Sequence, residues 1–495
     1  MTNTLSVPRK NRSRATCLAW LLFVLTAARM CLLCLPAPIT AYANNFDFIR
    51  QSACVGVWEH YTDRTKTEKH PGAPVDTLIF DGDRLHSACL NSSDNLFPWL
   101  ASRFHAKGAA LRLRDIGLIK ILVTLALLAY CLALDIPGPL RLGLAVAGYL
   151  ALSDFAILCY YDTLYTEVTG IVGVVALCFL LAITVHKRAH PSRVQLAAYA
   201  VLVLATGLSR AQDAPIAAAL ALTYAGVMLR RGLRGPALVM AFIALLTPTL
   251  QSAINPRHNP APASIAHANS TDTFLAAVLP AATDKAAALR MLHLPQSCAT
   301  AIGTDWYMIG AGPHPCPAVF KTGRWRLPPL FMAQPNTFFL PVLNAVRQSR
   351  PFLLLSIGHF ETPELPAALR VRLIAATSLS TWLDSMGPSA YCALMAAAAL
   401  LAAVSVVGLF REKRPDRIAA LTLVTLGGAV GVYALLSSVF GDGYFDMARH
   451  AILLLIGVAL QLGGIATIAA SIETNILRRF SKGIAALRVA LLPRK

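Results

Sequence analysis

The stretch Tyr160-Tyr161-Asp162-Thr163-Leu164-Tyr165-Thr166-Glu167 is polar, aromatic and acidic, and it separates two long apolar runs. These runs, at about 140–159 and 168–185, each have the length at which a helix spans the hydrocarbon core of a bilayer. The stretch, called the acidic patch below, is therefore predicted to be a loop at a membrane surface. A carboxylate there is costly unless it faces water, protein or a ligand, so Asp162 and Glu167 are candidate functional residues. The alternative is a solvated helix end without a role.

The composition is that of a polytopic membrane protein. Of the 495 residues, 56% are hydrophobic and only 14% are charged, which a soluble protein of this length would not show. The formal net charge is +19, but the Lys and Arg residues cluster in short segments between apolar runs, as the positive-inside rule expects for cytoplasmic loops. No nucleic-acid motif occurs among them, so we expect membrane lipids as partners and no nucleic acid.

The apolar runs predict an all-α polytopic membrane protein with about ten transmembrane helices and two large external loops. Both basic termini are expected in the cytoplasm. Gly-rich segments such as 427–431 are predicted to be packing faces between helices. The predicted organisation is a cytoplasmic N-terminus at 1–16, a first transmembrane helix at 17–36, a first external loop at 37–115, about six helices at 116–254, a second external loop or small domain at 255–385, about three helices at 386–472 and a cytoplasmic tail at 473–495.

With this topology, most carboxylates that border a span fall on the outer face, together with several cations. A carboxylate in such a place can act as a general base, while Arg can bind a phosphate with its planar fork of donors. A base and a phosphate clamp at a membrane surface suit a lipid-phosphate substrate. The candidates are Asp47, Asp162, Glu167, Asp213, Asp442 and Asp446, with Arg50, Arg210, Arg449 and His450.

Several of these residues lie in motifs that resemble a known family. Residues 43–50, Ala-Asn-Asn-Phe-Asp-Phe-Ile-Arg, resemble the Asn-Asn-Gly-Asp-Phe-x-Arg pattern of bacterial multi-span proteins described as glycan-biosynthesis hexose transferases. The acidic patch resembles that family's Tyr-x-x-x-Tyr-x-Glu loop, and 441–450 resembles its late Gly-Asp-Gly and Arg-His element. Residues 269–294 resemble its external region. The family is of the GT-C type, which implies transfer of a sugar from a polyprenyl-phosphate donor to a glycan or lipid-linked acceptor at the bacterial cytoplasmic (inner) membrane.

The resemblance implies a role for each candidate. Asp47 matches the catalytic base of the first external loop. Two departures bear on the site, because Phe46 replaces the usual Gly and Arg210-Ala211-Gln212 replaces Lys-x-Gln. Substrate or acceptor binding is expected of Asp162, Tyr165, Glu167, Asp213 and Asp442, and lipid-phosphate binding of Arg50, Arg210, Arg449 and His450.

Each role has a structural alternative. Asp47 could cap a helix, because Asp near a helix start satisfies free backbone donors. The Gly441-Asp442-Gly443 segment could be a tight turn between spans, since Gly accepts positive φ. Arg449 and His450 could be an interfacial anchor.

Cysteine positions bear on the compartment. Of the 11 Cys, four fall in the predicted external loops, namely Cys54, Cys89, Cys298 and Cys316. Four Cys allow three disulfide connectivities, and the local pairs 54–89 and 298–316 are the simplest. This pairing fits an oxidising, periplasmic environment. Free, buried Cys is the alternative.

The sequence indicates neither a cofactor nor a metal. It holds no Gly-rich phosphate loop, Walker lysine or dinucleotide fingerprint, and its His residues lack metal-ligand spacing. We therefore expect a glycosyltransferase that needs no cofactor, because a polyprenyl-phosphate donor carries its own leaving group. A lipid-linked glycan flippase or transporter, or a non-catalytic membrane assembly protein, is the alternative.

Overall fold

A helix lies in each of the ten predicted spans, although the helix in 140–159 ends at Leu152. The computed structural model describes residues 9–43, 46–58, 75–187, 190–256, 258–310, 312–354 and 368–490, and the side chains of 9–13, 46–47 and 475–490 lie outside its described part. The ten helices are α1 (Arg9–Cys34), α4 (Leu113–Ala133), α5 (Gly138–Leu152), α7 (Glu167–Lys187), α8 (Arg193–Gly207), α9 (Asp213–Arg230), α10 (Arg234–Ile254), α18 (Pro388–Arg411), α19 (Pro415–Asp442) and α21 (Leu453–Ala490).

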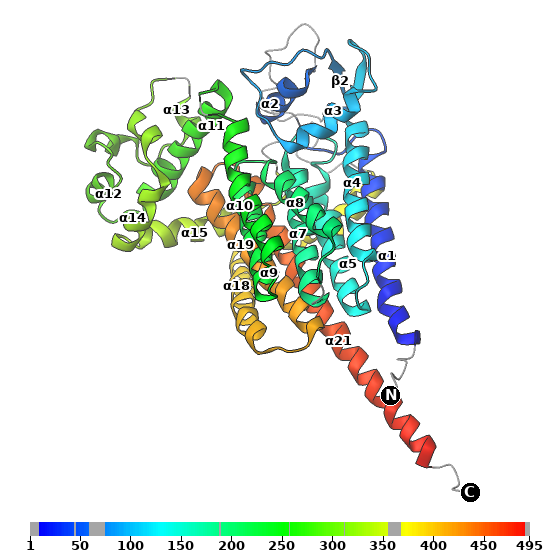
Figure 1. Cartoon of the computed structure of the whole chain (residues 1–495). Coiled ribbons are helices and arrows are strands. Elements are labelled where there is room, and N and C mark those ends of the chain that lie inside the picture. The colour runs from blue at the N-terminus through cyan, green and yellow to red at the C-terminus, as the bar shows by residue number, and fades with distance from the viewer. Residues whose placement is uncertain are drawn as a thin grey trace.

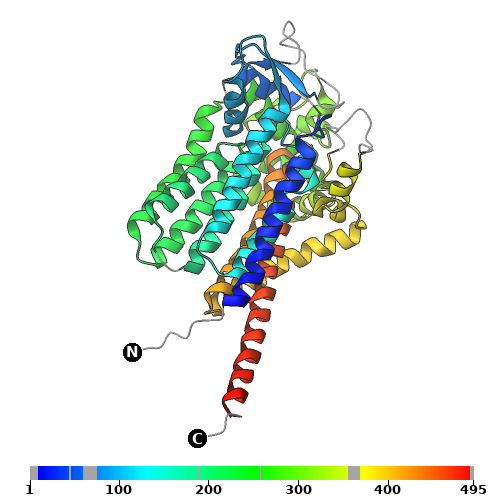
Figure 2. The ribbon, with the colours of Figure 1, turned by 90° about the vertical axis from the view of Figure 1, so that its right-hand side faces the viewer.

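Length and composition make the chain a helical, multi-pass membrane protein. Among the described residues, seven of these helices are long and apolar enough to cross a membrane: α1, α4, α7, α10, α18, α19 and α21. Helices α5 and α8 are apolar but have only 15 residues each. Figures 1 and 2 show the ten helices running side by side in one bundle. The most enclosed candidate span is α7, of which 83% is buried, whereas α18 is 11% buried at the periphery.

Small residues bring the helices into close contact. A Cβ atom added at Gly427 of α19 would lie 2.5 Å from the carbonyl oxygen of Gly457 in α21, and one added at Gly463 would lie 2.5 Å from that of Gly143 in α5. The backbones therefore approach more closely than any larger residue allows. The prediction that Gly427 lies on a packing face is confirmed.

The first predicted external loop folds over the upper end of the bundle. It contains α2 (Phe46–Val55), α3 (Leu96–Ser102) and an antiparallel sheet in the order β1 (Val57–Trp58), β2 (Thr77–Phe80) and β3 (Ala110–Arg112). Figure 1 shows α2, α3 and β2 together above α4. The disulfide between Cys54 and Cys89 joins α2 to the segment before α3, so the first predicted pair is confirmed.

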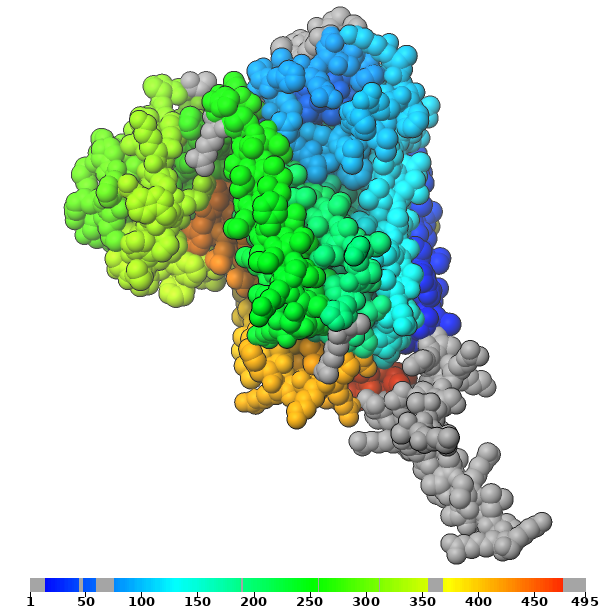
Figure 3. Space-filling model, viewed as in Figure 1, coloured from blue at the N-terminus to red at the C-terminus, as the bar shows by residue number. Residues whose placement is uncertain are grey.

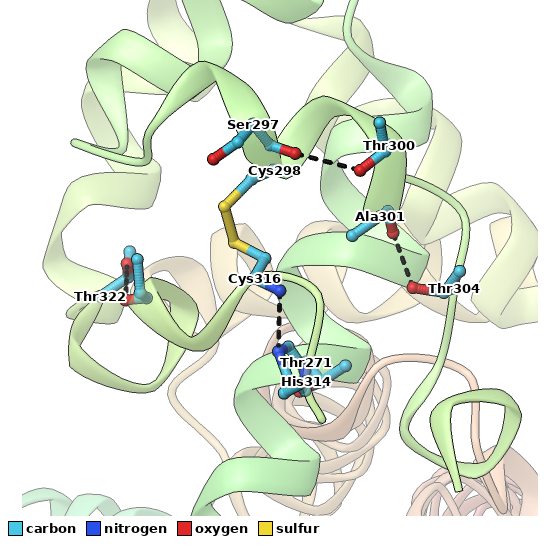
Figure 4. The surroundings of a disulfide bond; sticks show 10 residues. Thr271, Ser297, Cys298, Thr300, Ala301, Thr304, His314, Cys316 and Thr322 are labelled. Atoms are coloured by element: carbon cyan, nitrogen blue, oxygen red, sulfur yellow. Dashed lines mark hydrogen bonds between the residues drawn. A yellow bond between two sulfur atoms is a disulfide. The ribbon is translucent and has the colours of Figure 1, made fainter. Parts of the chain in front are cut away.

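The second predicted loop forms a helical lobe, defined here as residues 260–348. It contains α11 (Pro260–Thr271), a π-helical turn (Asp272–Val278), α12 (Lys285–Met291), α13 (Trp306–Ile309), α14 (Leu327–Ala333) and α15 (Asn336–Gln348). A separate apolar core includes Phe274, Leu289 and Leu330. The predicted disulfide Cys298–Cys316 is confirmed, and His314 beside it accepts from the Cys316 N–H and contacts Thr271 of α11 (Figure 4). Figure 3 shows the lobe projecting from the side of the bundle.

Four short helices remain, two between the lobe and α18 and two within the bundle. α16 (Leu369–Ala376) and α17 (Leu379–Asp384) are held by Arg29 of α1, whose guanidinium donates to Thr377 Oγ1, the Ile374 carbonyl and Ser378 Oγ. α6 (Phe155–Leu158) lies just before the acidic patch, and α20 (Met447–His450) links α19 to α21. In Figure 1 the turn between α18 and α19 lies at the end of the bundle opposite α2 and α3. Which end faces the cytoplasm stays a prediction.

Candidate functional site

The acidic patch is buried inside the protein. Asp162, Glu167, Tyr160 and Tyr161 each have 0% exposure. The position of the patch relative to the membrane surface stays a prediction, but the alternative of a solvated helix end is wrong. The reason is that the segment after α1 covers the patch, where the Tyr42 N–H donates to the Cys159 carbonyl over 3.0 Å.

Glu167 joins two arginines that come from distant parts of the chain. Its Oε1 accepts from Arg449 Nε at 2.8 Å and from Arg210 Nη1 at 3.3 Å. Arg210 also binds Asp213 with two nitrogens, at 3.0 Å and 3.3 Å, and Arg449 Nη1 lies 3.8 Å from Asp446. Gly170, one turn into α7, lets Asp213 pack there, because an added Cβ would lie 2.5 Å from Asp213 Oδ2.

His450 extends this group toward the lobe. Its Nε2 lies 2.5 Å from Asp442 Oδ2, and its Nδ1 lies 3.0 Å from Gln212 Oε1. Gln212 Nε2 donates to the His450 carbonyl, which fixes its amide so that Oε1 faces the ring. Both ring nitrogens therefore face acceptors, as in a charged imidazolium. With its amide turned to satisfy its neighbours, Asn269 of α11 donates to Asp442 Oδ1 over 2.5 Å.

Seven predicted site residues thus form one group, the charge cluster, which consists of Glu167, Arg210, Asp213, Asp442, Asp446, Arg449 and His450. It lies where α7 and α9 begin and where α19 ends. Each of these helices has its end there because a charged side chain borders its apolar run, Glu167 and Asp213 before it and Asp442 after it. Sequence patterns missed Gln212 as a functional contact, although the Arg210-Ala211-Gln212 motif contains it.

The acidic patch connects the charge cluster to α2. Tyr165 lies under the guanidinium of Arg449, 5.0 Å from ring centroid to Cζ, and its hydroxyl donates to the Ala43 carbonyl. The ring of Phe48 meets Tyr165 edge to face at 5.7 Å. Asp47 precedes Phe48 in α2, and its side chain lies outside the described residues. Arg50 is half-buried on the same helix. The roles of both stay predictions.

The electrostatics favour the charged forms of the cations. Burial alone would lower the pKa of Arg210, but the adjacent carboxylates of Asp213 and Glu167 outweigh it and raise the pKa above its ordinary value. Burial also opposes the charge of His450, yet the carboxylate of Asp442 raises the pKa of the imidazole. The charge cluster therefore combines four carboxyl groups with two guanidinium groups and one imidazole.

Asp162 lies apart from the charge cluster, against α4. A Cβ added at Gly117 of α4 would lie 1.8 Å from its Oδ1, and among the described residues neither carboxylate oxygen has a hydrogen-bond partner. Burial raises the pKa of Asp162 to about 8, against the opposing charge of Lys120. Lys120, itself buried in α4, donates to the carbonyls of Thr163 and Tyr160 and so supports the acidic patch from below. An ionisable residue inside an apolar run is the signal that points to Lys120.

The charge cluster is not an open pocket, and the part of the chain that the structure describes holds no group of metal ligands. No three His, Cys, Asp or Glu side chains in that part gather closely enough to hold a metal ion. An open pocket of about 400 Å³ is lined by Leu134, Lys187, His190 and Tyr199, at the opposite end of α7 from Glu167. The charges, and not the pocket, therefore define the candidate site.

Comparisons with known proteins give little beyond this geometry. No family model and no curated protein matches the sequence. A solved structure, the archaeal oligosaccharyltransferase AglB from Archaeoglobus fulgidus in complex with an inhibitory peptide and a dolichol-phosphate, is similar with a TM-score of 0.40 and 11% sequence identity. The match covers 96% of this chain, and the chain spans about half of that protein, 52%. A TM-score this low carries no argument about fold or function.

Proposed function

We propose that this chain is a GT-C-type membrane glycosyltransferase that moves a hexose from a polyprenyl-phosphate donor to a glycan or lipid-linked acceptor on the outer face of the bacterial inner membrane. One observation carries the proposal. Motifs that resemble the hexose-transferase family are far apart in sequence, yet Arg210 and Arg449 both bind the same oxygen of Glu167. The motif that contains Arg449, residues 441–450, also brings Asp442 and His450 into the charge cluster.

The two arginines supply the positive charge that a leaving phosphate needs. They are buried to 7–10% exposure, where a charge-assisted hydrogen bond is stronger than in water. Both are already paired with carboxylates, so the donor phosphate has to replace one of them. The weakest of these pairs joins Arg449 to Asp446, at 3.8 Å and with Asp446 15% exposed. We assign Asp446 as the carboxylate that the phosphate displaces.

The transfer step then needs one base. Asp47 accepts the proton of an acceptor hydroxyl. At the same time the oxygen of that hydroxyl bonds to the anomeric carbon of the hexose. The bond between that carbon and the phosphate oxygen breaks, and its electron pair leaves with the polyprenyl phosphate, next to Arg449 and Arg210. Phe48 supports this assignment, because its contact with Tyr165 brings the first turn of α2 beside the ring that lies under Arg449.

The test uses membranes that contain the chain, a radiolabelled polyprenyl-phosphate hexose and an extract of cell-envelope glycans. Asp47→Asn should lower the transfer rate by about 10²- to 10⁴-fold, the usual contribution of a general base. Asp83→Asn is the matched control, since Asp83 lies in the same predicted loop, is half exposed and forms a salt bridge with Lys107. If Asp47→Asn transfers hexose as fast as Asp83→Asn, the base assignment is wrong.

One observation favours a non-catalytic role as the second candidate. Each arginine of the charge cluster is paired with carboxylates, as in a purely structural ion network. Such a network would hold the ends of α7, α9 and α19 together in a membrane assembly protein. A chromosomal deletion complemented in full by the Asp47→Ala/Asp162→Ala double variant would favour this candidate over the enzyme.

A further inference from the structure

The seam between the lobe and the bundle is fixed by backbone contacts beside the charge cluster. Gly443, at φ 68°, packs directly on the lobe, because an added Cβ would lie 2.5 Å from the carbonyl oxygen of Asp272. Asp446 adopts a left-handed conformation at φ 46°, which is uncommon for a residue with a side chain. Strained positions of this kind cluster at functional sites. Phe445 lies in the turn between them.

Two aromatic rings lie exposed on this seam. Tyr307 of α13 is 76% exposed, and Phe445 of the bundle is 47% exposed. Their rings stack with centroids 6.2 Å apart and planes inclined by 20°. We call this pair the rim platform. It joins a ring from the lobe to a ring from the bundle.

Both rings are anchored to the polar residues beneath them. The N–H of Trp306, next to Tyr307, donates to the buried carboxylate of Asp272 over 2.6 Å. On the other side of the seam, Phe445 directly precedes Asp446, which pairs with Arg449. The platform is thus one residue away from the charge cluster on the bundle side.

We propose that the rim platform binds a sugar ring of the acceptor, an inference that rests on the proposed glycosyltransferase function and names its acceptor subsite. One face of a hexose ring carries axial C–H groups with partial positive charge, which pack on the negative face of an aromatic ring. The hydroxyl groups at its edge need acceptors, and the partly exposed carboxylates of Asp442 and Asp446 lie beside the platform. A lipid chain would gain nothing from these carboxylates.

The rigidity of the platform also suits this ligand. Tyr presents a large surface with only two side-chain torsions, so little conformational entropy is lost on binding. The stacked partner already restricts one of its faces, and the outer face stays open to solvent. Asp446, the carboxylate assigned above to exchange with the donor phosphate, directly follows Phe445, so a sugar that contacts the platform on its bundle side lies near this carboxylate.

A binding experiment tests the platform without turnover. The full chain in lipid nanodiscs is titrated with a panel of hexose trisaccharides of different linkages, and saturation-transfer NMR reports the bound sugar protons. We expect at least one trisaccharide to bind. Tyr307→Ala and Phe445→Ala should each weaken it on the order of tenfold, whereas Tyr307→Trp should keep it. Phe339→Ala is the matched control, because Phe339 is a 64% exposed aromatic residue of α15 that does not belong to the rim platform.

Two outcomes would overturn the inference. In the first, the wild type binds no trisaccharide, or Tyr307→Ala and Phe339→Ala weaken the binding equally. The other is quenching of the additional fluorescence of Tyr307→Trp by lipids brominated on their acyl chains, which would make the platform a membrane anchor. Failure of the proposed function gives a different result: the wild-type chain binds trisaccharides through Tyr307 but transfers no labelled hexose.

Discussion

Replacement of Glu167 by Gln tests the centre of the charge cluster. The change keeps the shape of a side chain that has 0% exposure and removes the charge that Arg449 and Arg210 share. At an effective dielectric constant of about 20, the distances of 2.8 Å and 3.3 Å correspond to about 6 and about 5 kcal/mol of Coulomb attraction. Desolvation offsets much of this, and removal of one partner from a buried pair typically costs about 3–5 kcal/mol. Because Arg210 keeps both contacts with Asp213, we expect the lower value, about 3 kcal/mol.

The assay is chemical unfolding of the purified chain in detergent, followed by circular dichroism. Asp446→Asn is the control and should cost about 1 kcal/mol or less, because its contact with Arg449 is longer and partly exposed. The double variant Glu167→Gln/Arg449→Gln should lose less than the sum of its single variants, since neither charge is left without the other. The reasoning is refuted if Glu167→Gln is as stable as Asp446→Asn, or if the two single effects simply add.

Three further predictions concern packing, pH and the lobe. Gly427→Ala should destabilise the chain by about 1–3 kcal/mol, because the added methyl group clashes with α21. Gly226 has open space around it, so Gly226→Ala should be neutral or slightly stabilising. Equal unfolding midpoints of the two variants would contradict this. Burial raises the pKa of Asp272 to about 7, so the folded chain binds a proton that the unfolded chain releases near pH 4, and stability should fall as pH rises from about 4 to 7. Asp272→Asn should therefore melt above the wild type at pH 8 but not at pH 4, and a constant difference would argue against it. The Cys298→Ser/Cys316→Ser variant should lose about 3 kcal/mol for a separation of 18 residues. Reductant should lower the melting temperature of the wild type more than that of the variant, which keeps only the Cys54–Cys89 bond; an equal shift in both would contradict the role of Cys298–Cys316.

The helices could be predicted from sequence because membrane insertion depends on the length of each apolar run. Each run found in the sequence contains a helix, although the run at 140–159 is interrupted after Leu152, and the basic segments marked the turns between them. The local disulfides were also predictable, because each pair lies within one segment between spans. The strands β1 to β3 were not, since they are only two to four residues long and carry little periodic signal.

The site was only partly predictable, because burial and pairing depend on packing between distant segments. Asp162 and Glu167 are five residues apart and equally acidic, yet one faces Lys120 and Gly117 while the other binds two arginines. Sequence gives no means of separating them. Family motifs pointed to Arg210 and Arg449, but no spacing rule shows that both reach one oxygen.

The shared oxygen of Glu167 has a consequence for the biogenesis of the chain. Arg449, which completes its coordination, lies 282 residues further along. At about 5–20 residues per second, a ribosome needs roughly 15–60 seconds to make that distance. The ribosome makes α7 to α10 during this interval. Of the two arginines, only Arg210 is then present to compensate the carboxylate. The final helices therefore do more than lengthen the bundle, because Arg449 between them adds the second cation to a carboxylate that Arg210 has held alone.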